Sequence, residues 1–286
     1  MIPGAASKAL PGYDFYAGLA RRLAAVRRPR GRIPVLLYHS VSPAADVRNA
    51  GLFNVTPATL DTQLHWLKDN GFHFITPEEW LAWRAAPPDT PLRRAIVAFD
   101  DGYRNNLEHA LPILQRHGVR AVFFIASSFL GAREPFPWID GPDRDAFRPM
   151  DAGGLRELDA AGMVVGAHTR THRRLNTLTD AEALSEIRES KKELERLLGK
   201  PVTTFAYPYG SKRDQSPRHA ELCREAGFTT AFTTRPVSST RRTDPFAIPR
   251  MTVYERDGTE LFGLKARGLF DGYDLFRRLI RTVCRR

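Results

Sequence analysis

The 286-residue chain has only two cysteines, Cys223 and Cys284. Two cysteines are too few for a disulfide framework, which excludes the small disulfide-stapled secreted domains and fits a reducing compartment. No apolar run in the sequence approaches the roughly 18 residues that a membrane-spanning helix needs. A signal peptide is missing too, because Arg21 and Arg22 interrupt the one apolar stretch near the start. We therefore expect a cytoplasmic protein without a transmembrane helix.

Acidic residues are in deficit, and the resulting net charge of +11 is concentrated at the two ends of the chain. Six arginines between residues 21 and 32 and five between residues 277 and 286 account for all of it, so the intervening chain is formally neutral. A broad basic face for a phosphate backbone is therefore not expected, and the sequence shows no zinc-finger, RRM or recognition-helix signature. We predict that the protein has no nucleic-acid partner.

Near both ends the arginines alternate with apolar residues at helical spacing, for example around Leu23 and Leu279. This spacing predicts two basic amphipathic arms, over residues 1–32 and 256–286. Such arms dock peripherally on an anionic membrane surface, here the inner face, or they pack on the domain with their arginines in solvent. The sequence leaves both alternatives open.

No internal repeat, low-complexity tract or linker divides the rest of the chain, which predicts one domain over residues 33–255. Within it, short apolar runs alternate with helix-like stretches. The expected strands are residues 35–41, 72–75, 96–99, 122–125, 164–167, 202–206, 229–232 and 248–253. The expected helices are residues 56–70, 77–84, 105–117, 155–161, 180–198 and 217–226. This alternation predicts a parallel sheet covered by helices, either open or closed into a barrel. The charged stretch 186–196 is interpreted as the solvated face of a helix, without a function.

Two adjacent carboxylates, Asp100 and Asp101, follow an apolar run that ends at Phe99 and precede the turn residue Gly102. Active sites of α/β proteins lie at the carboxyl ends of strands, where this pair is expected. Two carboxylates are costly to bury there unless a cation or a proton compensates them. The same residues also fit an ordinary turn, so the pair alone does not define a site.

A histidine pair, His168 and His172, follows another apolar run, residues 163–167. Because the two histidines are four residues apart, a helical turn would place both imidazoles on one face, at the same edge of the sheet as the aspartates. Two histidines and one carboxylate leave coordination positions open, which is typical of catalytic metal sites. With the second carboxylate as a base, these groups suit hydrolysis of a carbonyl compound by an activated water.

Three segments resemble, in their order, the motifs of the polysaccharide deacetylases with a NodB homology domain, carbohydrate esterase family 4. They are Phe99-Asp100-Asp101-Gly102, His168-Thr169-Arg170-Thr171-His172 and Phe205-Ala206-Tyr207-Pro208-Tyr209-Gly210. The resemblance extends over residues 33–253. It implies an α/β fold, a single-domain (β/α) barrel that is incomplete or distorted compared with a TIM barrel and has about seven parallel strands.

The resemblance also implies a role for each motif. In the family the first aspartate of the first motif is the general base and the second is a metal ligand, which assigns these roles to Asp100 and Asp101. His168 and His172 complete the site for one divalent ion, which is zinc or else cobalt, nickel or iron. The backbone N–H of Tyr209 matches the group that stabilises the tetrahedral oxyanion.

Two groups of the family pattern are missing, and the sequence offers a replacement for each. The arginine that pairs with the catalytic aspartate is replaced by Ala206, so Arg250 is the candidate partner, unless it is a surface arginine. The late histidine that protonates the leaving amine is absent, since the last histidine is His219. The start of the domain resembles the biofilm poly-N-acetylglucosamine deacetylases, in which the acid histidine precedes the first motif. We therefore assign His39 as a general acid with an ordinary pKa, the alternative being a structural histidine.

Four further residues are assigned to the substrate. Trp138 is expected to wall the acetyl pocket or to anchor its loop, Tyr103 and Asn106 to bind sugar hydroxyls, and Tyr207 to line the site. The expected function is metal-dependent deacetylation of N-acetylhexosamine units in a bacterial exopolysaccharide or its lipid-linked precursor, with release of acetate. The alternatives are an esterase, amidase or deformylase acting on another acylated saccharide, or a catalytically silent saccharide-binding or membrane scaffold protein.

Overall fold

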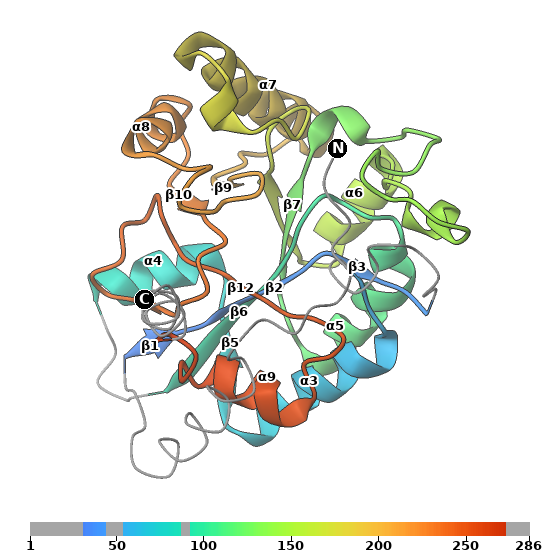
Figure 1. Ribbon diagram of the computed structural model, residues 1–286, viewed down its shortest axis with the longest axis vertical. Helices are drawn as coiled ribbons and strands as arrows, with labels where there is room; N and C mark the ends of the chain where they lie inside the picture. Colours follow the sequence, from blue (N-terminus) through green and yellow to red (C-terminus); the bar gives the residue numbers. More distant parts are fainter. Residues whose placement is uncertain (1–30, 44–53, 87–91, 273–286) are drawn as a thin grey trace, which may run out of the picture.

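The computed structural model describes residues 31–43, 54–86 and 92–272 (Figure 1). Residues 1–30 of the predicted N-terminal arm and residues 273–286 of the predicted C-terminal arm lie outside these described ranges. Within the described ranges, no helix combines the length and the apolar character needed to cross a bilayer.

A curled sheet of parallel strands forms the centre of the molecule (Figure 1). Its strand order is β10 (Thr230–Phe232), β9 (Thr204–Ala206), β8 (Val164–Ala167), β7 (Val122–Ile125), β6 (Arg93–Phe99), β2 (Val35–Tyr38) and β12 (Met251–Thr252). An additional strand, β5 (Phe72–Phe74), pairs with the first half of β6. The seven strands of the main order form a partial (β/α) barrel, which confirms the predicted fold class.

The chain segment around β12, one outer strand of this sheet, also contacts the other outer strand, β10. Ile248 forms a parallel bridge with Phe232 of β10, whereas Met251 pairs with Leu36 of β2. Two short pairs lie beside the sheet: β1 (Arg32–Ile33) with β11 (Ser239–Thr240), and β3 (Ser40–Val41) with β4 (Asn54–Val55). Residues 248–252 therefore curl the sheet by joining its two edges.

Helices surround the sheet, and most begin at a capped residue. They are α3 (Pro57–Asp69), α4 (Pro77–Ala85), α5 (Leu111–His117), α6 (Ala152–Ala160), α7 (Asp180–Leu198), α8 (Pro217–Glu225) and α9 (Thr259–Ala266). Thr76 and Glu79 form a capping box before α4, and Thr179 and Glu182 form another before α7. A π-helical turn, η1 (Asn106–Ala110), precedes α5 just after the first motif.

The two faces of the sheet carry separate cores. Val97 and Phe99 pack in one cluster with apolar residues of the helices, whereas Ile96 and Ala98 pack in a second cluster with inward-facing residues of the other strands. Trp80 of α4 belongs to this second cluster. The alternation follows from the strand period of two, which sends neighbouring side chains to opposite faces.

Strand register brings the sequence motifs to one edge of the sheet. Tyr38 pairs with Phe99, Phe99 pairs with Phe123, and Ala167 pairs with Phe205. All of these strands run in the same direction, so the residues that follow β2, β6, β8 and β9 emerge together. The first residues after these four strands are His39, Asp100, His168 and Tyr207.

Gly166 in β8 leaves room for an interior ring, and this predicts a stability effect. A Cβ atom at this position would lie 2.5 Å from Phe124 Cδ1 and 2.9 Å from Thr204 Cγ2. Gly166→Ala should therefore lower the free energy of unfolding by about 1–3 kcal/mol, because the neighbouring side chains are fixed in a packed core. Urea unfolding followed by circular dichroism measures the change, and an unaltered midpoint would contradict this packing.

Candidate active site

Three side chains at the sheet edge form a compact cluster of metal-ligating groups. One ligand atom each from Asp101, His168 and His172 lies within 4.8 Å of the others. Asp101 Oδ1 is 3.6 Å from His168 Nε2 and 3.4 Å from His172 Nε2. Asp101 and His168 are buried, and His172 is largely so. The structure thus brings together the three residues that the sequence assigned to a metal.

The expected helical turn over residues 168–172 is wrong, because this segment is an irregular loop. Thr169 and His172 have positive φ angles of 60° and 58°, so the chain reverses twice within a few residues. The His172 backbone N–H donates to Thr169 Oγ1 at 3.0 Å, which fixes the second reversal. Asp101 and Tyr209 are the other described non-glycine residues with positive φ. Such strained conformations concentrate at functional sites, here around one cluster.

The cluster fits a divalent cation such as zinc. Asp101 Oδ1 is buried and has no hydrogen-bond partner among the described residues. Burial, reinforced by the neighbouring Asp100 charge, raises the pKa of Asp101 well above its usual value, which is the direction expected for a carboxylate that a cation would stabilise. Burial lowers the pKa of His168 and of His172, which keeps both imidazoles neutral, as metal ligands must be.

Hydrogen bonds orient two of these ligands. His168 Nδ1 donates to the Ala206 carbonyl oxygen at 2.8 Å, so the lone pair of Nε2 points towards the carboxylates. The Tyr103 hydroxyl hydrogen-bonds Asp101 and accepts from Trp138 Nε1 at 2.9 Å. The Trp138 ring in turn lies 4.5 Å from the His172 ring, centroid to centroid. These contacts therefore orient His168 and Asp101, and the bond to the Ala206 carbonyl fixes the tautomer of His168.

Asp100 lies next to this cluster and forms a buried ion pair with Arg250. The two guanidinium nitrogens of Arg250 donate to the two carboxylate oxygens at 2.5 and 2.9 Å, and Arg250 Nε donates to the Thr233 carbonyl oxygen at 3.1 Å. Burial acts to raise the pKa of Asp100, but the charge of Arg250 outweighs it and leaves the pKa below its usual value. Asp100 is therefore a buried carboxylate that stays ionised.

His39 follows β2 at the same edge, where it is half-buried. Burial lowers its pKa from 6.5 to about 4, while the Asp100 charge acts in the opposite direction. The ordinary pKa expected from the sequence is therefore wrong, and this imidazole is neutral at pH 7.

Three of the four residues expected to contact the substrate are instead buried and hydrogen-bonded within the protein. Tyr103, Tyr207 and Asn106 are fully buried. The Tyr207 hydroxyl donates to the Phe246 carbonyl oxygen at 3.0 Å. Asn106 donates to the His39 carbonyl oxygen at 2.7 Å and accepts from the backbone of Val41. The assignment of Tyr103 and Asn106 to sugar hydroxyls was therefore wrong, and the buried Tyr207 is not open to substrate. The partly exposed Trp138 lies next to His172 of the cluster.

Tyr209 lies at the mouth of the site. Its side chain is 41% exposed, and its ring lies 5.1 Å from the His172 ring on one side. On the other side the guanidinium carbon of Arg174 is 3.4 Å from the ring centroid. Among the described residues the backbone N–H of Tyr209 donates to no recorded acceptor. This donor is therefore available to a ligand.

Helix α7 holds the loop that carries the two histidines, which the sequence interpretation of residues 186–196 missed. Glu186 accepts from the backbone N–H groups of Arg170 and Thr171 at 3.0 and 2.8 Å and from the Thr171 hydroxyl at 2.7 Å. Glu193 accepts from Ser127 Oγ and from Arg170 Nε. Glu186 and Glu193 are seven residues apart, so they share a helix face, and this spacing is the one sequence signal for the contact.

A buried cluster of metal-ligating side chains beside an ionised carboxylate, at the carboxyl edge of a partial barrel, fits a hydrolase site. The family model described as polysaccharide deacetylase matches residues 88–231, and the chain belongs to this family.

Individual relatives agree with this assignment. The chain is 25% identical over 232 residues to YxkH of Bacillus subtilis, covering 81% of this chain and 75% of the relative. It is 24% identical over 213 residues to the poly-beta-1,6-N-acetyl-D-glucosamine N-deacetylase of Staphylococcus aureus, covering 74% and 71% of the two chains. The solved structure of IcaB from Ammonifex degensii matches with a TM-score of 0.68 at 24% identity, over 84% of this chain and 98% of that one. The last similarity concerns the fold, a partial (β/α) barrel.

The anchoring of the histidine loop predicts an effect on metal affinity. Glu186→Gln keeps the size of the side chain but replaces one acceptor oxygen with an NH2 group, which donates and cannot accept from the loop. We expect zinc affinity to fall by about 10- to 100-fold, as for other groups that orient metal ligands. Titration against a chelating indicator measures it. Glu189→Gln, which alters an exposed acid of the same helix paired with Lys192, should leave the affinity unchanged. Equal affinities in both variants would contradict the role of Glu186.

Proposed function

We propose that the protein is a metal-dependent deacetylase that hydrolyses N-acetyl groups of N-acetylhexosamine units in a bacterial exopolysaccharide or its lipid-linked precursor. The observation that carries this proposal is that two adjacent carboxylates have different bonding partners. Asp100 is paired with Arg250, and its Oδ2 lies 3.7 Å from His168 Nε2, within the reach of the Asp101 cluster. A base and a cation site side by side are the groups that amide hydrolysis by water requires.

The chain's own residues divide the reaction between them. When bound by Asp101, His168 and His172, a divalent ion, most simply zinc, supplies positive charge that polarises an acetyl carbonyl and acidifies a water molecule. Asp100 accepts the proton of the attacking water, and it is ready to do so because Arg250 keeps it ionised. The Tyr209 backbone N–H donates to the oxyanion of the tetrahedral intermediate.

We assign the second proton transfer to His39, which acts as a relay and not as the general acid expected from the sequence. Since the imidazole is neutral at pH 7, it holds no proton to spare at the start of the reaction. The proton that reaches the leaving nitrogen is then the one that Asp100 took from water. A neutral imidazole accepts a proton on one ring nitrogen and releases one from the other, so His39 relays it as the C–N bond breaks. The products are acetate and a free amine.

The identity of the saccharide rests on the relatives. The Staphylococcus aureus relative is named for poly-beta-1,6-N-acetyl-D-glucosamine, which supports a hexosamine polymer as the substrate. We extend this proposal in two ways. A lipid-linked precursor of the polymer is an alternative substrate, and the basic arms dock on an anionic membrane. An esterase, amidase or deformylase acting on another acylated saccharide uses the same groups, and comparing acetate release from N-acetylglucosamine oligomers and acetylated xylan separates these activities.

The base assignment predicts the behaviour of Asp100→Asn. The amide keeps the shape of the side chain but cannot accept the proton of water, so kcat should fall about 100-fold or more. Acetate release from N-acetylglucosamine oligomers measures it, and metal content is determined on the same samples. The role of Asp100 would be refuted by a variant that binds metal normally and keeps most of its activity.

The lowered pKa of His39 predicts the pH profile. A group whose pKa has fallen from 6.5 to about 4 is neutral throughout the range from pH 5.5 to 8.5 and does not titrate there. The profile of kcat/KM over this range should therefore lack a descending limb near pH 6.5. Comparing the native protein with His39→Gln tests the point. A limb near pH 6.5 that disappears in His39→Gln would mean that a protonated His39 is the active form.

A further inference from the structure

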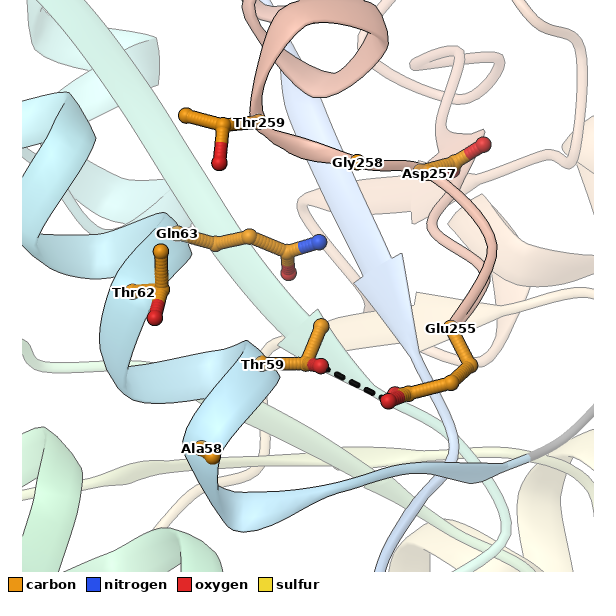
Figure 2. A pocket seen from close by; sticks show the side chains of 8 residues that line it. All are labelled: Ala58, Thr59, Thr62, Gln63, Glu255, Asp257, Gly258 and Thr259. Carbon is orange, nitrogen blue, oxygen red and sulfur yellow. Dashed lines mark hydrogen bonds between the residues drawn. The ribbon is translucent and has the colours of Figure 1, made fainter.

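A second polar cavity lies at the rim of the barrel, outside the residues assigned to the reaction. It has a volume of about 190 Å³ and lies between the first two turns of α3 and the turn from β12 to α9 (Figure 2). Its lining residues are Ala58, Thr59, Thr62 and Gln63 of the helix and Glu255, Asp257, Gly258 and Thr259 of the turn.

The cavity lies at the catalytic end of the barrel and is connected to it. β12 runs parallel to β2, and the Val253 backbone N–H donates to the Leu37 carbonyl oxygen at 2.9 Å, so the turn leaves the sheet at the same edge as the motifs. The Tyr38 hydroxyl donates to Gln63 Oε1 at 2.8 Å. Tyr38 immediately precedes His39. The inner wall of the cavity is therefore bonded to the strand that carries the proposed proton relay.

Gln63 presents an unused donor to this space. The residue is only 2% exposed, yet its Nε2 has no hydrogen-bond partner among the described residues. Figure 2 shows the Gln63 amide nitrogen directed into the gap between the helix and the turn. A buried amide without a partner is costly, which indicates that an acceptor oxygen belongs in the gap.

The remaining polar groups favour a neutral, hydroxylated ligand. Thr62 and Thr259 contribute hydroxyls, which both donate and accept. The carboxylates of Glu255 and Asp257 disfavour an anion. They are not free for a cation either, because their charges are already engaged.

The contacts of the two carboxylates show this engagement. Glu255 accepts from the Thr56 backbone N–H at 2.7 Å and from the Thr59 hydroxyl at 2.8 Å, at the positive end of α3. Asp257 accepts from the Tyr254 backbone N–H at 2.9 Å and from the buried Lys265 ammonium at 2.5 Å. The oxygens of both carboxylates are therefore occupied by donors of the protein, and the cavity offers a ligand the Gln63 amide and the remaining hydroxyls.

We propose that this cavity is a saccharide subsite that holds one sugar unit of the substrate chain, beyond the unit that is deacetylated. Its volume is below the roughly 300–1,000 Å³ of sites for drug-sized ligands, which suits a single ring. The hydroxyls of a hexose supply the acceptor for Gln63 and the partners for the threonines. This inference rests on the proposed deacetylase function and names a further part of the chain that the enzyme recognises.

The test uses the length of the substrate. For the full-length native protein, KM for acetate release should be about tenfold lower with the six-unit β-1,6-linked N-acetylglucosamine oligomer than with the two-unit oligomer, because only the longer chain reaches the subsite. Thr62→Trp fills the cavity from an exposed position on α3 and should abolish this difference. His65→Trp, an equal substitution at an exposed residue of α3 outside the cavity, should preserve it.

The results distinguish failure of the subsite from failure of the function. A length dependence that survives in Thr62→Trp, or one that is absent from the native protein, overturns the subsite. If the native protein releases no acetate, the proposed function fails, and calorimetric binding of the six-unit oligomer then decides the subsite alone. Binding about tenfold weaker in Thr62→Trp than in His65→Trp supports the subsite, and equal binding overturns it.

Discussion

Two carboxylates buried side by side at the end of β6 are the constraint on which the site depends. Asp100 and Asp101 are each 3% exposed, and a charged carboxylate in that position needs a nearby opposite charge. The fold meets this need in two different ways: Arg250 binds Asp100 in the protein itself, whereas Asp101 faces two neutral imidazoles and a cation site. The pKa of Asp100 is therefore low and that of Asp101 high, a difference that the proposed roles of base and metal ligand require of adjacent residues.

Much of the fold could be predicted because its signals are local. The apolar runs at residues 122–125 and 164–167 and the charged helix over residues 180–198 have the predicted bounds, since strand and helix periods and a capping box are readable within a few turns. The common edge of the motifs also followed from sequence, because parallel strands carry their carboxyl ends to the same side. Short strands such as β12 extend over fewer residues than their apolar runs suggested.

Contacts and burial around the site could not be predicted in the same way. The loop after β8 is not helical, because Thr169 and His172 adopt left-handed conformations that a residue spacing of four does not reveal. Tyr103 and Asn106 follow the aspartates directly, yet both turn inwards and bond to the protein, since the chain bends around them. The pKa of His39 depends on burial among groups from distant strands, and no local pattern records that burial.

The curling of the sheet has a consequence for how the protein matures during synthesis. Arg250 lies in the segment that joins both edges of the sheet, and it is 150 residues away from its carboxylate partner. A nascent chain that has folded as far as β10 already contains the aspartates and both histidines but lacks the guanidinium that compensates Asp100. Asp100 thus acquires its counter-charge only when the segment of β12 docks. Joining of the two sheet edges and pairing of Asp100 are in this way one event.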